Sequence, residues 1–248
     1  MNNEKKNRNY RLLRRVIAGL LSLVILSVSG VLIYTSFYYH ADASVVTFAM
    51  ESDESVDVRQ VSNGWLYDGP GEGTCIVFYP GAKVEATSYG ALMKRIAESG
   101  TDCVLVKMPL NMAFMDINAM DEVRSELNYD HWYIAGHSLG GAMAGIYANS
   151  HLDSLDGIIF LASFSTKPLQ RNGFKALSIY GSEDHVLKMK SYEKNKSNEP
   201  TDFTECVIAG GNHGQFGYYG QQKGDGEALI SAEEQQRQTV EAIRSFLL

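Results

Sequence analysis

The chain contains Ile134-Ala135-Gly136-His137-Ser138-Leu139-Gly140-Gly141, a run that places a serine in the pattern G-x-S-x-G. Residues 131–135 before it predict a short buried strand, and residues 139–150 after it predict a helix of small and apolar side chains. Two glycines flank the serine and lack a Cβ atom, so strand and helix can close around a sharp turn that exposes the Ser138 hydroxyl. The run therefore predicts a strand–turn–helix unit that presents a nucleophile.

A serine hydroxyl is a weak nucleophile, so this unit needs a general base and an orienting carboxylate elsewhere in the chain. A predicted strand at residues 175–180 is followed by Glu183 and Asp184, of which Asp184 is preferred as the acid and Glu183 is the alternative. A later predicted strand leads into a glycine-rich loop that holds His213, which is preferred as the base over His185. The order serine, acid, histidine along the chain is the one found in α/β-hydrolases.

Four separate blocks, in the right order, carry a resemblance to a known family: residues 79–84, residues 108–114, the G-x-S-x-G run, and residues 210–221. Together they resemble the small bacterial α/β-hydrolase family of the hydrolase-5 type, which is similar in sequence to dienelactone hydrolases and carboxylesterases. The resemblance implies an α/β-hydrolase fold and a catalytic triad of Ser138, Asp184 and His213.

The same resemblance implies an oxyanion hole made by two backbone amides. One belongs to Leu139, directly after the nucleophile, and the second is expected from Ala82, although the chain lacks the H-G-G-G run of many lipases and esterases at that loop. Lys83, His137 and Gln215 are the candidate substrate contacts. Lys83 stands beside the expected hole, where it either attracts an acidic substrate or is simply solvated.

These parts predict a serine hydrolase that acts on an acyl ester, lactone or thioester through an acyl-enzyme. Two alternatives stay open: a membrane-tethered acyltransferase that uses the same triad, and a catalytically silent binding module. No cofactor and no metal site is expected. Only residues 162–174 fill the place where such folds often insert a lid, so we expect no lid domain and an open site for a small-molecule acyl substrate.

The N-terminus predicts a membrane segment. Residues 16–39 contain no charged side chain, and as a helix they would span about 36 Å, against about 30 Å for a hydrocarbon core. Residues 1–15 form a basic tail with six Lys and Arg, which is expected to stay in the cytoplasm while residues 40–248 are exported as the hydrolase domain. We therefore expect a single-pass signal anchor in the cell membrane. The alternative is a cleaved signal peptide with Ala41-Asp42-Ala43 as its site.

Charge and cysteine content argue against a nucleic-acid-binding protein, a disulfide-linked protein and a zinc protein. The first 40 residues carry a net charge of +5, which leaves −12 for the rest of a chain whose total is −7. Such an acidic domain is a poor nucleic-acid binder. Three cysteines, an odd number without close spacing, predict buried thiols rather than disulfides or a zinc site. Nothing in the sequence indicates an oligomeric state.

Strand and helix patterns alternate through the remaining chain and predict a mostly parallel sheet with helices on both faces. The predicted strands are residues 44–48, 55–61, 65–67, 74–79, 102–106, 131–135, 157–161, 175–180 and 203–208. The predicted helices are residues 86–98, 115–127, 139–150 and 231–246, and Asn63-Gly64 predicts a hairpin turn.

Overall fold

The structure is a computed structural model that describes residues 2–248. Met1, the first residue of the predicted basic tail, lies outside the described residues. The chain divides into two units, one ending at Phe37 and the other comprising Tyr38–Leu248.

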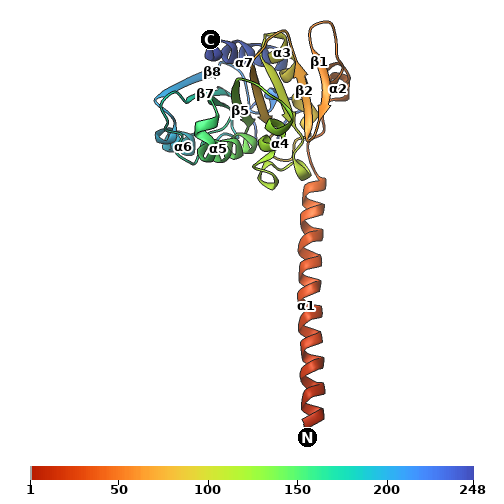
Figure 1. Cartoon of the computed structure of the whole chain (residues 1–248). Coiled ribbons are helices and arrows are strands. Elements are labelled where there is room, and N and C mark those ends of the chain that lie inside the picture. Colours follow the sequence, from red (N-terminus) through yellow and green to blue (C-terminus); the bar gives the residue numbers. More distant parts are fainter. Residues whose placement is uncertain (1) are drawn as a thin grey trace. The chain divides into compact units, whose positions relative to one another are not determined.

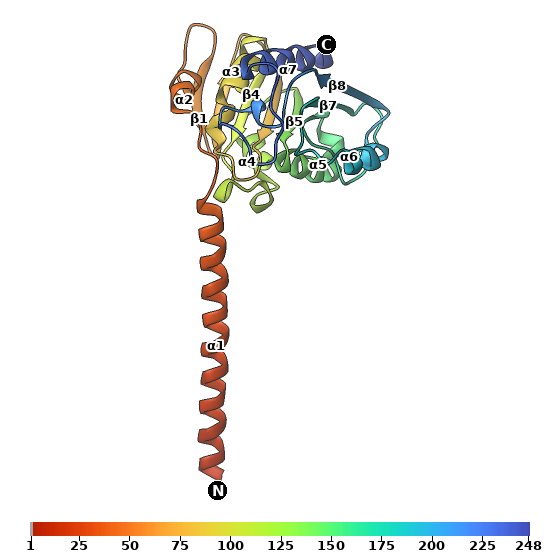
Figure 2. The same ribbon diagram turned by 180° about the vertical axis from the view of Figure 1, so that it is seen from behind.

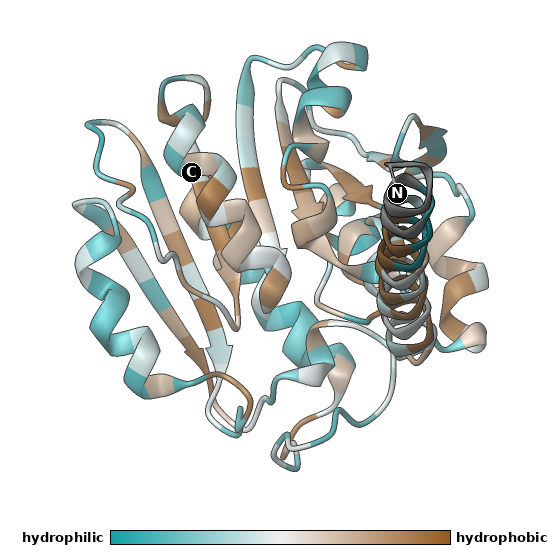
Figure 3. Cartoon of the chain, turned by 90° about the horizontal axis from the view of Figure 1, so that it is seen from below, coloured by the Kyte–Doolittle hydropathy of each residue, from teal (hydrophilic) through white to brown (hydrophobic). Residues whose placement is uncertain are grey.

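The first unit is one long helix, α1 (Asn2–Ser36). Its segment Tyr10–Ser36 is apolar (Figure 3) and long enough to cross a membrane. The large apolar side chains of this segment are exposed. The helix begins inside the predicted tail, and it ends three residues earlier than the predicted segment. Residues 37–39, expected in the membrane helix, therefore lie outside it.

The second unit is built on an eight-stranded sheet with the order β1-β2-β4-β3-β5-β6-β7-β8 (Figure 1). Strand β2 runs antiparallel to both of its neighbours, and all other pairs are parallel. The strands are β1 (Asp57–Val61), β2 (Gly64–Asp68), β3 (Thr74–Tyr79), β4 (Asp102–Val106), β5 (His131–His137), β6 (Gly157–Leu161), β7 (Lys175–Gly181) and β8 (Asp202–Ile208).

Helices cover both faces of the sheet, with α3 and α7 on one and α4, α5 and α6 on the other (Figures 1 and 2). Alternate strand residues feed two apolar clusters: Ile76 and Phe78 pack with α3, whereas Val77 packs with α4 and α5. The α-helices of this unit are α2 (Ala43–Met50), α3 (Gly90–Glu98), α4 (Ala119–Glu126), α5 (Leu139–His151), α6 (Met189–Asn195) and α7 (Ala232–Leu247). The short 3₁₀ helices are η1 (Ala86–Tyr89), η2 (Pro109–Asn111), η3 (Ala113–Met115), η4 (Leu152–Ser154), η5 (Lys196–Asn198) and η6 (Gly214–Phe216).

The predicted strand at residues 44–48 is wrong, because this segment belongs to helix α2. Its N-terminus is capped by Asp42, whose carboxylate accepts a hydrogen bond from the Ser44 amide at 2.9 Å. At its other end the buried Lys94 ammonium donates to the carbonyls of Phe48 (3.1 Å) and Glu51 (2.7 Å). A cap and a distant lysine thus outweigh the β-branched residues of the segment.

The other strands form where the sequence predicts them, with small shifts. The hairpin turn lies at Ser62–Asn63, because Gly64 is already part of β2 and pairs with Val61. Helix α6 was not predicted. Residues 162–174, all described, hold no helix or strand, as expected for a fold without a lid. Cys75 and Cys103 are buried as predicted, whereas Cys206 is half-buried, and all three thiols are free.

Candidate active site

Ser138 lies at the turn between β5 and α5 with φ 53° and ψ −120°. Residues other than glycine rarely adopt this backbone conformation. Glycines make the turn possible: a Cβ atom on Gly136 would lie 2.5 Å from the Gly141 amide nitrogen, and one on Gly140 would lie 2.1 Å from the Tyr79 carbonyl oxygen. The serine is therefore held in the strained strand–turn–helix geometry that the sequence predicts.

Two hydrogen bonds fix the backbone of this serine. Its amide donates to the Leu161 carbonyl at 2.9 Å, and its carbonyl accepts from the Ser163 hydroxyl at 2.7 Å. Both partners come from the end of β6 and the loop that follows, so the neighbouring strand stabilises the turn. The side chain of Ser163 is a part of the site that the sequence patterns did not reveal.

Asp184 and His213 form a pair. The His213 Nδ1 lies 2.8 Å from the Asp184 Oδ2, and both side chains are 1 % exposed. The other carboxylate oxygen accepts from the amides of Val186 (2.9 Å) and Leu187 (2.7 Å), which fixes the orientation of the acid. The imidazole Nε2 is buried and has no hydrogen-bond partner among the described residues.

The competing residues lie outside this pair. The Glu183 carboxylate accepts a hydrogen bond from its neighbour Ser182 at 2.8 Å and, within residues 2–248, makes none to a histidine. His185 is exposed, and its backbone amide points to Asp225. The structure therefore brings together Asp184 and His213, the preferred acid and base, and neither alternative.

The loop that carries His213 is braced by two residues that the sequence did not single out. The Asp225 carboxylate accepts from the amides of His213 (3.2 Å) and Gly214 (2.8 Å). The buried Gln235 side chain of α7 pairs with the backbone of Asn212 on both sides, accepting from its amide (2.9 Å) and donating to its carbonyl (2.8 Å). The only sequence signal for Gln235 is a polar residue on the inner face of a predicted helix.

His137 does not fit its predicted role as a substrate contact. Its side chain is fully buried, its Nδ1 lies 2.8 Å from the Tyr89 hydroxyl, and its ring centroid lies 4.5 Å from that of His213. Burial, followed by the neighbouring His213, lowers the pKa of His137 well below its usual value, so this imidazole is neutral. The His137 ring packs against the His213 ring inside the domain and so helps to hold it in place.

The two amides expected to form an oxyanion hole lie at adjoining elements. Leu139 begins α5, and Ala82 lies in the oxyanion turn, which we define as the β-turn Gly81–Val84, closed by a hydrogen bond from the Val84 amide to the Gly81 carbonyl at 3.4 Å. Neither the Leu139 nor the Ala82 amide has a hydrogen-bond partner within residues 2–248. The close approach of Gly140 to Tyr79, which leads into this turn, places the two segments side by side.

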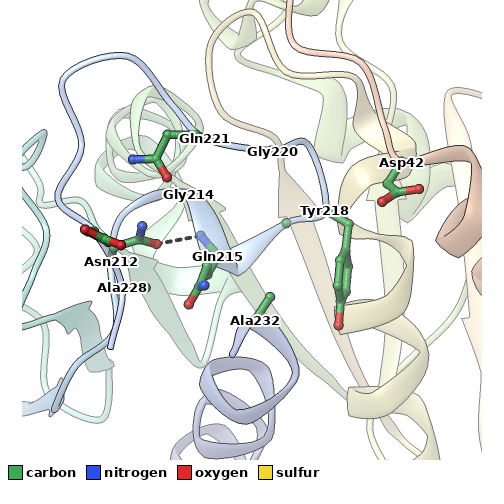
Figure 4. Close-up of a pocket in the computed structure, with 11 residues that line it drawn as sticks. Asp42, Asn212, Gly214, Gln215, Tyr218, Gly220, Gln221, Ala228 and Ala232 are labelled. Atoms are coloured by element: carbon green, nitrogen blue, oxygen red, sulfur yellow. Dashed lines mark hydrogen bonds between the residues drawn. The ribbon is translucent and has the colours of Figure 1, made fainter. Parts of the chain in front are cut away.

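The other expected substrate contacts occupy different surroundings. Lys83 is half-buried and lies in the oxyanion turn. Gln215 lines a polar cavity of about 360 Å³ together with Asn212, Tyr218 and Asp42 (Figure 4). The backbone amide of Gln215 donates a hydrogen bond to the Asn212 Oδ1 at 3.1 Å. The Gln215 side-chain Oε1 is buried and unpartnered within the described part of the chain. Ser138 is not among the residues that line this cavity.

Searching residues 2–248 for three or more His, Cys, Asp or Glu side chains that could share a metal ion finds none.

Comparisons with known proteins agree with this fold. A family model described as alpha/beta hydrolase family matches residues 75–237, whereas no curated protein matches the chain. Similar solved structures include a monoacylglycerol lipase from Paleococcus ferrophilus (15 % identity, TM-score 0.58, covering 77 % of this chain and 99 % of that one). A dienelactone hydrolase from Anabaena variabilis has 12 % identity and TM-score 0.58, with coverage of 77 % and 99 %. A CIB-like hydrolase from Thermoplasma acidophilum has 16 % identity and TM-score 0.54, with coverage of 77 % and 98 %. At such identities the structural likeness establishes the fold, and the family match covers most of the chain.

Proposed function

Because the chain belongs to the alpha/beta hydrolase family, we propose that it hydrolyses a carboxylic acyl ester, lactone or thioester with Ser138, His213 and Asp184 as its catalytic triad. The observation that carries the proposal is the buried His213–Asp184 pair, in a chain that presents Ser138 on a strained turn. The His213 Nε2 of this pair has no hydrogen-bond partner among the described residues. Base and acid are thus prepared for a nucleophile that needs them.

In the proposed reaction, His213 Nε2 takes the proton of the Ser138 hydroxyl as Oγ forms a bond to the acyl carbon. The same proton then passes to the leaving group as its bond to that carbon breaks, which leaves an acyl-enzyme. Water, deprotonated by His213, attacks the acyl carbon. The bond from that carbon to Oγ then breaks as His213 returns the proton to Oγ, which releases the acid and restores Ser138. Asp184 holds the proton on Nδ1 throughout, so that Nε2 stays free to accept. Within residues 2–248 no hydrogen bond joins the Ser138 hydroxyl to His213, and catalytic hydrogen bonds of this kind often tighten only when substrate binds.

The oxyanion formed at each step needs donors in place before the reaction. We assign this role to the amides of Leu139 and Ala82, which have no other partner in the described residues. Each such donor lowers the barrier by roughly 3–4 kcal/mol. The substrate class follows from the absence of a lid in residues 162–174: a site without a roofing domain suits short or soluble acyl groups better than long chains.

A fluorophosphonate probe tests this function directly. We expect it to label Ser138 covalently, as identified by mass spectrometry of the labelled peptide, and short esters to compete with the labelling. Addition of alcohols or amines then shows whether the acyl group passes to water or to another acceptor. Absence of labelling in a folded protein that also turns over no ester would contradict the proposed activity.

We further propose that α1 is an uncleaved anchor and that the hydrolase domain lies outside the cytoplasm. The apolar segment Tyr10–Ser36 and the basic residues at its N-terminal side support this orientation. A reporter fused after Leu248 is expected to be active only outside the cytoplasm, and the full-length protein should resist a carbonate wash of membranes. A soluble exported form beginning at Ser44 would show cleavage instead, and a cytoplasmic reporter would reverse the topology.

A further inference from the structure

The residues directly after α1 pair with a loop of the candidate active site. We call Tyr38–Asp42 the strap. Its second residue, Tyr39, forms a parallel bridge with Val84: the Tyr39 amide donates to the Lys83 carbonyl at 2.7 Å, and the Tyr39 carbonyl accepts from the Glu85 amide at 2.9 Å. Two residues after Tyr39, the Ala41 amide donates to the Glu85 carboxylate at 3.1 Å. The strap is thus joined to the oxyanion turn by backbone hydrogen bonds.

That turn is strained at Lys83, which has φ 57° although it is not glycine. A residue in this conformation costs about 1–2 kcal/mol and persists only where its surroundings hold it. Two backbone bonds hold Lys83: its amide donates to Asn111 at 2.8 Å, and its carbonyl accepts from Tyr39. The Ala82 amide belongs to the Gly81–Ala82 peptide of the same turn, two peptide units before the Lys83 carbonyl that accepts from Tyr39, so the Tyr39 bond helps to hold the turn in which that amide lies.

The strap also binds the loop that follows the base. The Asp42 amide donates to the Tyr218 carbonyl at 2.8 Å, and the Tyr39 hydroxyl accepts from the Lys223 amide at 3.0 Å. The Tyr39 ring packs on Tyr219, with ring centroids 5.6 Å apart. Tyr219 in turn contacts Tyr89, whose hydroxyl accepts from the amide of Gly81. One short segment therefore contacts the oxyanion turn and the loop after His213.

We propose that Tyr39 is a positioning residue of the active site, through which the segment that follows the membrane helix holds the oxyanion turn and the loop after the base in register. The role in catalysis rests on the proposed function. It has a consequence for processing: cleavage after Ala43 would separate the strap from the domain and lower its activity, so an uncleaved N-terminus is part of the working enzyme.

Proline substitutions in the full-length protein, purified in detergent, test the strap because they remove single amide donors. Tyr39→Pro removes the bond to Lys83 together with the ring and the hydroxyl, so Tyr39→Ala, which keeps the amide, is measured beside it to isolate the backbone bond. His40→Pro is a control for the proline itself, since the His40 amide donates no hydrogen bond in residues 2–248, and it loses only a side-chain contact to Glu85 at 3.5 Å. Tyr39→Phe keeps the backbone bonds and the ring, and loses only the hydroxyl. We measure kcat and KM per phosphonate-titrated site, the Tm, and hydrogen exchange at the amides of Lys83 and Glu85.

For Tyr39→Pro we expect kcat to fall about 10- to 100-fold with KM within about twofold, because a misplaced donor affects the transition state and not the bound substrate. Exchange at Lys83 and Glu85 should be about tenfold faster. The control should stay near wild type in both measurements. Tyr39→Phe, which loses only the bond to Lys223, should leave exchange at Lys83 and Glu85 near wild type and lower kcat less than Tyr39→Pro does. A lowered Tm with unchanged kcat per titrated site would overturn the positioning role.

Hydrogen exchange separates this proposal from the proposed function. If the wild-type protein neither reacts with the probe nor turns over esters, the hydrolase assignment fails, yet the strap is still tested by exchange. Unchanged protection of the oxyanion turn in Tyr39→Pro would overturn the strap whatever the activity. Faster exchange in Tyr39→Pro alone, with normal kcat, would contradict its role in catalysis.

Discussion

Replacing Ser138 by alanine is expected to abolish fluorophosphonate labelling and to lower ester turnover about 10⁶-fold, the loss typical of a removed serine nucleophile. No bond to the acyl carbon can form without Oγ, so only the oxyanion amides and substrate binding remain. The measurement is kcat of the purified variant, with probe labelling followed in parallel. Ser150→Ala is the control. Ser150 is exposed near the C-terminal end of α5, the helix that follows Ser138, so this variant should keep full activity.

The fold of this variant should be unaffected. The Ser138 Oγ makes no hydrogen bond within the described residues, and alanine tolerates the backbone conformation no better and no worse. We therefore expect the free energy of unfolding to stay within about 0.5 kcal/mol of wild type. Turnover that persists in the folded variant would refute Ser138 as the nucleophile.

Replacing Asp184 by asparagine is expected to lower kcat about 10⁴-fold. The Oδ1 of Asp184 accepts from the amides of Val186 and Leu187, so the oxygen of the substituted side chain will stay there and its NH₂ group will face His213. A donor at that position favours the tautomer with a bare Nδ1 and a protonated Nε2. Such an imidazole cannot accept the serine proton.

Glu183→Gln is the matched control, because it makes the same chemical change one residue away. Its carboxylate bonds only to Ser182 among the described residues, so activity should remain near wild type. If the glutamine variant loses activity and the asparagine variant keeps it, the acid is Glu183. Rates are measured at several pH values, so that a variant whose pH optimum has shifted is not mistaken for one that has lost activity.

The sheet and the nucleophile turn follow from local sequence signals. Apolar runs such as residues 74–79 and 157–161 can only be buried, and the glycines around Ser138 have no other use than a close approach of strand and helix. Helix α2 could not be predicted in the same way. Its apolar β-branched residues favour a strand, and what makes it a helix is the distant, buried Lys94.

The candidate site divides along the same line. Asp184 and His213 follow strands and stand in recognisable loops, so their order and position predict them. Asp225 and Gln235 act through backbone groups of a loop that lies near them only after folding, and no spacing in the sequence reveals such contacts. The prediction for His137 was based on its place next to the nucleophile, which suggests an exposed side chain. The turn instead directs this side chain into the interior.

The brace from Gln235 has a consequence for the order in which the enzyme becomes active during its synthesis. A ribosome makes this chain from the N-terminus, so the strap and the nucleophile turn emerge long before α7. Until α7 docks, the backbone of Asn212 lacks both of its partners in Gln235, so one of the braces on the loop that carries His213 is missing. We therefore expect the site on a nascent chain to reach full reactivity with a fluorophosphonate probe only after α7 has folded onto the sheet.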